Sequence, residues 1–375
     1  MNQRLMHFKS AFIKDGEMWC VPTVFNWLFK INLKDWSVKS VCDLELEDWF
    51  HIDYIYRYQN DVWCITAVGV RVIGYNMLTG KVEHFGMTGE DQRRNRGTVL
   101  FNGRLWIAPI ELPGKMISFD VIKKKFTVHD SWEKGCQNWN LSGKAVSFCH
   151  VENTIYMTLK GECKVIQFDL EKEGLKIKSL PGKYGLRCIF TAHNNVYATS
   201  SVKRKLFQWN ENGEIIRKIR CSYQQNKPYV RGMEFGNKIL LMDDKTIDIF
   251  DIETEKITPY YEIDDLLEGD GFPLFFIHMR YGTKYFLIPW RANALLEFDR
   301  EEKGWTGHIL RIPEELFFKE YVLKKISLQN VIMEGELLME DLVNYVTAGC
   351  NKKQEHKLHK QIGEDIYSRL SMDIY

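Results

Sequence analysis

Short stretches in which apolar and polar residues alternate recur along the chain, and turn-forming residues separate them. Residues 81–85, Lys-Val-Glu-His-Phe, are one example, and Asn76 to Gly80 form the turn before them. Alternation with a period of two is typical of half-buried strands, whereas Gly, Asn and Asp favour tight turns. The pattern therefore predicts a protein built of many short strands joined by turns.

One feature occurs seven times. It begins with a pair of turn-forming residues and ends with an apolar residue followed by a large apolar residue, and in some repeats one further residue separates the two parts. We call it the first marker, and Asp15 to Trp19 and Asn102 to Trp106 show it most clearly. Asn-Gly and Asp-Gly pairs accept positive φ, which tight hairpin turns require. The seven markers end at Trp19, Trp63, Trp106, Tyr156, Tyr197, Leu240 and Phe286, which are 44, 43, 50, 41, 43 and 46 residues apart.

A second marker, an apolar or aromatic residue before Asp or Asn, follows each first marker after 11 to 14 residues. Its Asp or Asn residues are Asn32, Asn76, Asp120, Asp169, Asn210, Asp251 and Asp299. Four short strands and three turns in about 44 residues make one blade of a β-propeller. Residues 1–312 are therefore predicted to form an all-β, seven-bladed β-propeller. The alternative, a β-solenoid, needs much shorter repeats.

The repeats resemble those of Kelch-like and PQQ-like β-propellers, most clearly in Tyr75 to Lys81 and in Phe250 to Thr254. The resemblance covers residues 7–312, although the Gly-Gly doublet of Kelch repeats is missing and no blade ends in Trp-Asp. Because these families include enzymes, lectins and scaffolds, the resemblance implies a fold and leaves function open. Ring closure by strand exchange would need residues 1–5 or 321–332 to add a strand.

Residues 313–375 are predicted to form a C-terminal helical extension. Pro313 and the acidic residues after it are typical of a helix start, and residues 336–346 carry an apolar stripe at helical spacing. We expect the extension to pack on the propeller, and a docking element for another protein is the alternative. His356 and His359 lie three residues apart, but without further ligands they predict a solvated pair rather than a metal site.

The charge balance limits the classes of partner. Lys and Arg number 51 and Asp and Glu 50, so bulk charge gives no support to a nucleic-acid or membrane partner. No run of 18 apolar residues is present, and the start of the chain lacks a secretory h-region. The nine Cys contain no CxxC pair, which favours reduced thiols. We expect a cytoplasmic, bacterial protein without a cofactor or metal.

Basic residues recur at one repeat position, where the innermost strand of a blade begins. Arg96 and Arg187 lie ten residues before the end of their first markers, and Arg231 lies nine residues before the end of its own. Lys144 lies near the same place in the fourth blade, and Asp53 holds this position in the second blade. Cations in one channel mouth repel unless acids or an anionic ligand compensate them. The sequence thus predicts either an anion site or pairing with loop acids. These acids are Glu90, Asp91, Asp264 and Asp270.

Rings and titratable groups are expected on the same loop-rich face. Trp139 and Trp290, with Arg291 beside Trp290, are candidates to contact a sugar or peptide, although rings between blades also pack as ordinary core. A set for proton transfer is also present and consists of His51, Asp53, Tyr184 and Tyr229.

Two functions follow from these residues. The first is a non-catalytic binding or scaffold propeller that recognises a protein or an anionic ligand on its loop-rich face. The second is a lyase or epimerase that acts on an acidic carbohydrate or related metabolite in the central channel. No nucleotide-binding, triad-hydrolase or zincin motif is present in the sequence, which favours the first.

Overall fold

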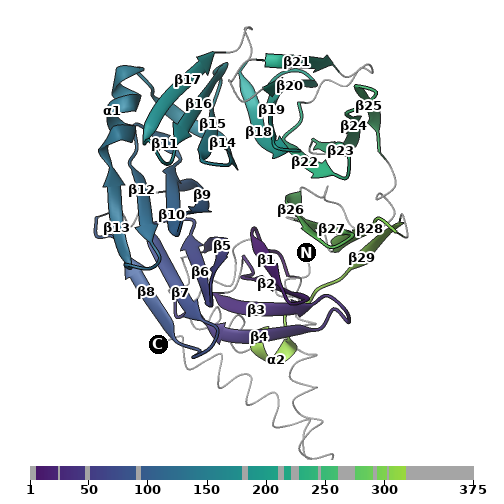
Figure 1. Cartoon of the computed structure of the whole chain (residues 1–375). Coiled ribbons are helices and arrows are strands. Elements are labelled where there is room, and N and C mark those ends of the chain that lie inside the picture. Colours follow the sequence, from purple (N-terminus) through teal and green to yellow (C-terminus); the bar gives the residue numbers. More distant parts are fainter. Residues whose placement is uncertain are drawn as a thin grey trace, which may run out of the picture.

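The computed structural model describes residues 6–23, 26–46, 51–89, 94–179, 185–209, 215–220, 228–243, 246–260, 275–289, 294–301 and 304–317. Seven antiparallel sheets surround a central axis in the order in which they occur along the chain (Figure 1). The predicted all-β, seven-bladed β-propeller is therefore confirmed. We number the sheets as blades one to seven.

Blade one contains β1 (Ala11–Lys14), β2 (Glu17–Cys20), β3 (Trp27–Asn32) and β4 (Val38–Asp43), and blade two contains β5 (Ile52–Tyr58), β6 (Asp61–Thr66), β7 (Arg71–Asn76) and β8 (Val82–Gly86). Blade three contains β9 (Asn95–Phe101), β10 (Arg104–Pro109), β12 (Met116–Asp120) and β13 (Lys125–His129), and blade four contains β11 (Glu111–Leu112), β14 (Gly143–Val151), β15 (Thr154–Leu159), β16 (Lys164–Asp169) and β17 (Gly174–Ser179).

Blade five contains β18 (Leu186–Ala192), β19 (Asn195–Ser200), β20 (Lys205–Trp209) and β21 (Ile215–Arg220), and blade six contains β22 (Arg231–Phe235), β23 (Lys238–Met242), β24 (Ile247–Asp251) and β25 (Lys256–Pro259). Blade seven contains β26 (Phe275–Tyr281), β27 (Lys284–Pro289), β28 (Leu295–Asp299) and β29 (Gly304–His308). The helices are α1 (Asp130–Asn138), between blades three and four, and α2 (Glu314–Phe317).

The two sequence markers correspond to two turns of each blade. A two-residue turn joins the first and second strands of every blade, and Asp15, Gly16, Asn102 and Gly103 in these turns all have positive φ. At the end of the third strand the Asp or Asn side chain accepts backbone N–H groups, as Asp120 does from the two residues 122 and 123 at 3.0 and 2.8 Å. These local hydrogen bonds start the turn into the fourth strand.

The second strand of a blade buries both of its faces, because a blade lies between two neighbours, whereas outer strands such as β8 keep exposed positions. In β6, Val62 and Cys64 pack between blades one and two, whereas Trp63 and Ile65 pack between blades two and three. Seven such apolar clusters are present, one between each pair of neighbouring blades, and we call each a seam. The core is therefore a ring of seams around an open centre.

Loops on one side of the ring tie each blade to the next. The Asn95 side chain in blade three donates to the carbonyls of Thr66 and Gly69 of blade two, at 3.1 and 2.8 Å. Strand β11, from the blade-three loop, pairs with the start of β14 in blade four. These links fix the first residues of the inner strands, which are the residues that face the central axis.

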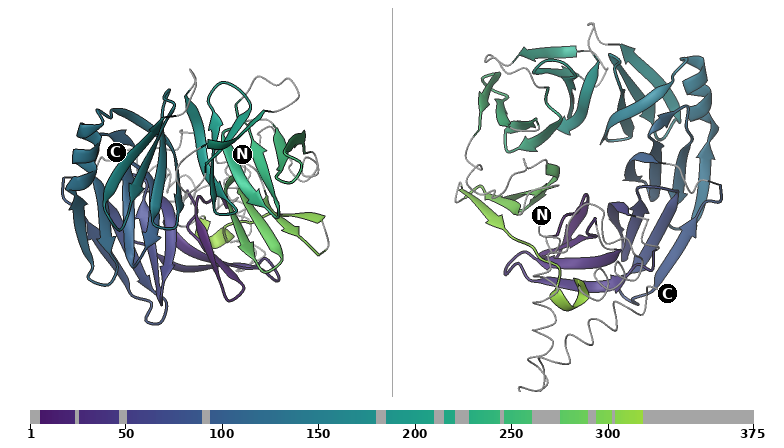
Figure 2. Two further views of the ribbon diagram at one scale, coloured as in Figure 1. Left: turned by 45° about the horizontal axis from the view of Figure 1, so that its top comes forward. Right: turned by 180° about the vertical axis from the view of Figure 1, so that it is seen from behind.

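The ring closes through a seam between blades seven and one rather than through a shared strand among the described residues. Phe286 and Leu295 of blade seven pack against Met18 and Phe29 of blade one. The backbone N–H of Met6 donates to the carbonyl of Leu310 at 2.9 Å, and the last sheet lies beside the first (Figure 2).

The predicted C-terminal extension lies outside the described residues beyond its first turn, α2, whose Phe317 is buried in the closing seam. Among the residues that the structure describes, no helix has the length and apolar character needed to cross a bilayer.

Candidate functional site

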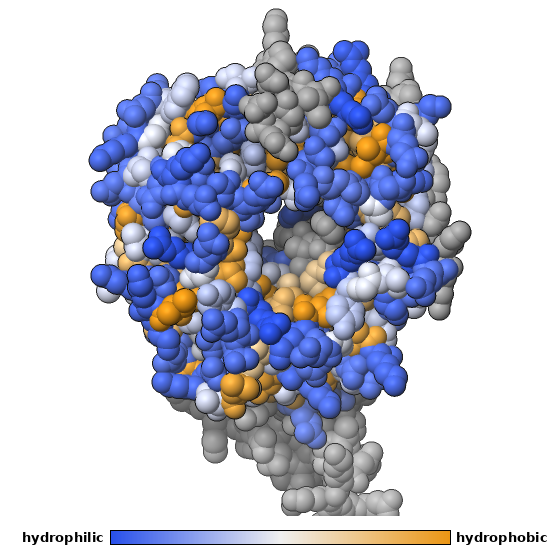
Figure 3. All heavy atoms as spheres, in the orientation of Figure 1, coloured by the Kyte–Doolittle hydropathy of each residue, from blue (hydrophilic) through white to orange (hydrophobic). Residues whose placement is uncertain are grey.

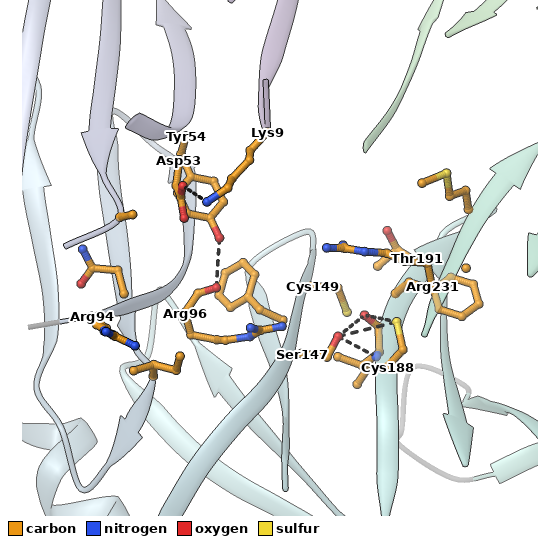
Figure 4. Close-up of a pocket in the computed structure, with 18 of the residues that line it drawn as sticks. Lys9, Asp53, Tyr54, Arg94, Arg96, Ser147, Cys149, Cys188, Thr191 and Arg231 are labelled. Atoms are coloured by element: carbon orange, nitrogen blue, oxygen red, sulfur yellow. Dashed lines mark hydrogen bonds and ion pairs between the residues drawn. The ribbon is translucent and has the colours of Figure 1, made fainter. Parts of the chain in front are cut away.

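A cavity of about 640 Å³ lies at the centre of the ring. Its described lining comes from the inner strands of blades two to six, from the loops at Val68 and Ile110, and from Lys9 before β1. The space-filling view shows a hollow whose wall carries both hydrophilic and hydrophobic residues (Figure 3). The close-up shows Arg96 and Arg231 on opposite sides of the site (Figure 4).

In blades two to five the repeat position that carries the predicted basic residues is a β-bulge, whereas Arg231 of blade six pairs with Met242 in regular register. Register shifts leave Asp53, Arg96, Val146 and Arg187 unpaired in the inner strands of blades two to five. A bulge bends the strand and re-aims the side chain. The bulge therefore allows charged residues to occupy a strand whose other positions are buried in the seams.

The bulges also free backbone carbonyls, and these carbonyls hold the site together. The Tyr54 hydroxyl donates to the carbonyl of Arg96 at 3.0 Å, and Nη2 of Arg96 donates to the carbonyl of Val146 in the next blade. Nε of Arg96 is buried without a hydrogen-bond partner in the described structure. This guanidinium thus makes one hydrogen bond to the described protein, through Nη2.

Positive charge dominates the described lining. Its basic residues are Lys9, Arg94, Arg96 and Arg231, and its one carboxylate is that of Asp53. Asp53 already pairs with Lys9 at 2.5 Å. No ion pair between described residues involves Arg96. Burial lowers the pKa of Arg96, and repulsion from Arg231 and Arg187 lowers it further, against the opposing effect of Tyr54. The site therefore favours an added negative charge.

The other titratable groups with resolved shifts in the cavity stay neutral near pH 7. Burial, with a contribution from Asp53, raises the pKa of Tyr54 to about 12. Burial also raises the pKa of the Cys149 and Cys188 thiols. Hydroxyl and thiol groups with raised pKa values are poor general bases and nucleophiles.

The structure brings some of the predicted site residues together. Asp53, Arg96 and Arg231 line the cavity, and the exposed Arg187 lies close enough to Arg96 to affect its pKa. Tyr184, Trp290 and Arg291 lie outside the described residues, as do the acids proposed to pair with the arginines, Glu90, Asp91, Asp264 and Asp270.

Other predicted residues lie elsewhere, and here the expected placement is corrected. Lys144 is exposed beside β11, because the bulge of blade four falls at Val146. Trp139 follows α1, a helix that the sequence did not predict, and is 52% exposed away from the cavity lining. Tyr229 is fully buried and donates its hydroxyl to Asp248. His51 is exposed before β5 and is not part of the lining.

Lys9, Arg94 and Tyr54 are among the cavity residues that the sequence analysis missed. Lys9 lies ten residues before Trp19, which is the repeat position of Arg96 in the first blade, so the same spacing would have found it. Arg94 and Tyr54 carry no such signal, because they enter the cavity through the loop links and the bulges.

A second polar cluster lies away from the cavity and has the connectivity of a hydrolase triad. Nε2 of His129 is 2.8 Å from Oγ of Ser118, and Nδ1 is 3.0 Å from Oε2 of Glu173. Ser118 is 1% exposed, and His129 stacks on Trp106 in the seam of blades three and four. A substrate has no access to this serine, so the cluster joins blades rather than performing chemistry. The described residues contain no group of three His, Cys, Asp or Glu placed to hold a metal.

None of the known protein-family models matches the sequence, and no curated protein is similar to it. Solved β-propellers share its fold. YCF48 from Cyanidioschyzon merolae is 10% identical with a TM-score of 0.62, over 80% of this chain and 98% of that one. Virginiamycin B lyase from Staphylococcus aureus is 13% identical with a TM-score of 0.57, over 76% of this chain and 93% of that one.

An extracellular domain of a two-component system shares the fold as well. The extracellular domain of the two-component system BT3049 from B. thetaiotaomicron is 14% identical with a TM-score of 0.53, over 77% of this chain and 39% of that one. At these identities the similarity establishes the β-propeller fold, and the Kelch-like or PQQ-like resemblance has no support at family level.

Proposed function

We propose that this protein is a binding propeller that holds an anionic group in its central cavity. The group is a carboxylate or phosphate, which belongs to a small molecule or to a protein partner. The observation that carries this proposal is the convergence of Arg96 and Arg231 from different blades around a lining whose one described carboxylate already pairs with Lys9. Guanidinium groups bind carboxylate and phosphate through two parallel hydrogen bonds.

The described groups favour binding over acid–base catalysis. Tyr54 keeps its proton up to high pH, and the cavity thiols do so as well. Two similar propellers were solved with a ligand, YCF48 with a D1 peptide and virginiamycin B lyase with quinupristin. These cases support ligand binding by propellers in general.

The test is a thermal-shift titration with citrate, inorganic phosphate and a glutamate-rich peptide at low ionic strength. A ligand at 100 times its dissociation constant stabilises the protein by about 2.7 kcal/mol. The three probes distinguish a small carboxylate, a phosphate and an acidic peptide. If none of them stabilises the protein, the proposal is wrong.

A charge-matched pair of variants locates the site. Arg96→Gln combined with Arg231→Gln removes charge-assisted hydrogen bonds worth about 1.5–3 kcal/mol each, so affinity should fall by at least roughly tenfold. Lys218→Gln combined with Arg220→Gln removes two exposed cations of the outer strand β21 and should leave affinity unchanged. Equal losses from inner and outer variants would indicate binding through general charge and not in the cavity.

A further inference from the structure

The cavity is larger and more apolar than an inorganic anion requires. Its volume of about 640 Å³ lies within the range of about 300–1,000 Å³ typical of sites for organic ligands. Three half-buried apolar side chains, Val68, Ile110 and Phe148, line it together with the arginines. The wall therefore offers two kinds of contact, one cationic and one apolar.

Two of the arginines that line the cavity, Arg96 and Arg231, share a local arrangement. Each is followed by glycine, in the dipeptides Arg96-Gly97 of β9 and Arg231-Gly232 of β22. The ring of Phe148, from β14, lies against Gly97, and the ring of Phe190, from β18, lies against Gly232. Phe148 and Phe190 both line the cavity. An aromatic ring thus packs against the residue that follows each arginine in its strand.

Glycine is what permits each ring to approach the neighbouring inner strand so closely. A Cβ atom at position 97 would lie 2.4 Å from Cγ of Phe148, and one at position 232 would lie 2.1 Å from Cζ of Phe190. Both distances are far below carbon–carbon contact, so any other residue would displace the ring. The sequence Arg-Gly therefore places a cation and a ring side by side twice in one cavity.

We infer that the ligand is an organic anion that carries an aromatic ring or a similar apolar group beside its carboxylate or phosphate. This inference rests on the proposed anion site and names the class of its ligand. The anionic group contacts the guanidinium of Arg96 or Arg231, and the apolar group packs on the half-buried face of Phe148. Aromatic contacts of this kind add to the gain from burying apolar area.

Matched probe pairs test the inference in the unmodified full chain. Benzoate should bind with roughly tenfold or more higher affinity than acetate, as expected for burial of a phenyl group. Phenyl phosphate should bind more tightly than inorganic phosphate by a similar factor. Equal binding within each pair would refute the aromatic class and leave the anion site standing. Benzamide, which lacks the charge, should bind weakly. If benzamide binds as well as benzoate, or no probe binds, the proposed function fails with the inference.

Variants of the ring provide a second measurement. Phe148→Ala should weaken benzoate binding far more than acetate binding and so remove most of the preference for benzoate. Phe148→Leu, which keeps an apolar side chain, should retain part of this preference. Phe207→Ala is the control, because Phe207 is a half-buried phenylalanine of β20 that packs in the seam of blades four and five. Loss of the preference in the control, or its retention in Phe148→Ala, would overturn the role of the ring.

Discussion

Two guanidinium groups of this propeller, one buried and one half-buried, have opposite surroundings. Arg204, in the seam of blades five and six, is 4% exposed, bonds to Asp243 and Asp248, and lies over the ring of Tyr229 at 4.8 Å. Arg96, in the cavity, donates to one backbone carbonyl and has Arg231 and Arg187 as its neighbouring cations.

The difference separates an arginine that stabilises the fold from one that is available to a ligand. A buried charge is costly unless an opposite charge compensates it. Carboxylates of the protein compensate Arg204, whereas Arg96 has no carboxylate partner among the described residues. Arg204 is the more deeply buried of the two, and the identity of their partners distinguishes their roles.

The largest expected effect comes from Arg204→Met. This change leaves two buried carboxylates without their cation, so the free energy of unfolding should fall by about 3–5 kcal/mol. Urea denaturation followed by tryptophan fluorescence measures the loss. Arg204→Met with Asp243→Asn and Asp248→Asn should recover part of the stability, because the uncompensated charges are gone. A loss below about 1 kcal/mol for the single variant would contradict the structural role of Arg204.

An intermediate effect is expected from Tyr54→Phe, which removes the hydroxyl that donates to the carbonyl of Arg96 at 3.0 Å. One hydrogen bond contributes about 0.5–1.5 kcal/mol to stability near pH 7. The folded state raises the pKa of Tyr54 from the ordinary 10.0 to about 12, so its neutral form is favoured by folding.

The sign of the pH dependence follows from this raised pKa. The stabilisation is present below pH 10 and is lost as the pH rises from 10 towards about 12. Urea midpoints at pH 8 and pH 11 should therefore differ less in Tyr54→Phe than in the parent protein. An identical alkaline loss in both proteins would show that Tyr54 does not contribute.

The smallest effect on stability is expected from Arg96→Met. The variant loses the hydrogen bond to Val146 but also removes a desolvated charge repelled by Arg231. The free energy of unfolding should therefore change by less than about 1 kcal/mol, in either direction. The same urea titration measures it beside Arg204→Met. A destabilisation as large as that of Arg204→Met would break the distinction between the two arginines.

Much of the fold could be predicted because its signals are local. The first marker sets a two-residue turn, and the Asp or Asn of the second marker bonds to the backbone two or three residues later. Both depend on neighbouring residues only, so Asp169 in blade four forms the predicted turn as Asp120 does in blade three. Helix α1 was missed because its first turn begins without a capping side-chain hydrogen bond.

The candidate site could be predicted only in part. Spacing located Asp53, Arg96 and Arg231, since a repeat position of a propeller lies at one level of the channel. Spacing failed for Lys144, because whether a residue sits at the bulge depends on the pairing of the next strand. Tyr229 was misjudged because its burial depends on Arg204 and Asp248. Arg204 directly precedes strand β20, and Asp248 lies in strand β24.

The sequence by itself determined the number of blades and the turns within them, because repeat spacing and turn chemistry act over a few residues. Only the tertiary structure decided which of the cations find a carboxylate. Arg96 and Arg231 are far apart in the chain and approach because the ring of blades closes, and Arg204 finds Asp243 and Asp248 because blade six packs beside blade five. Electrostatic compensation depends on distances across blades, and no local pattern encodes those distances.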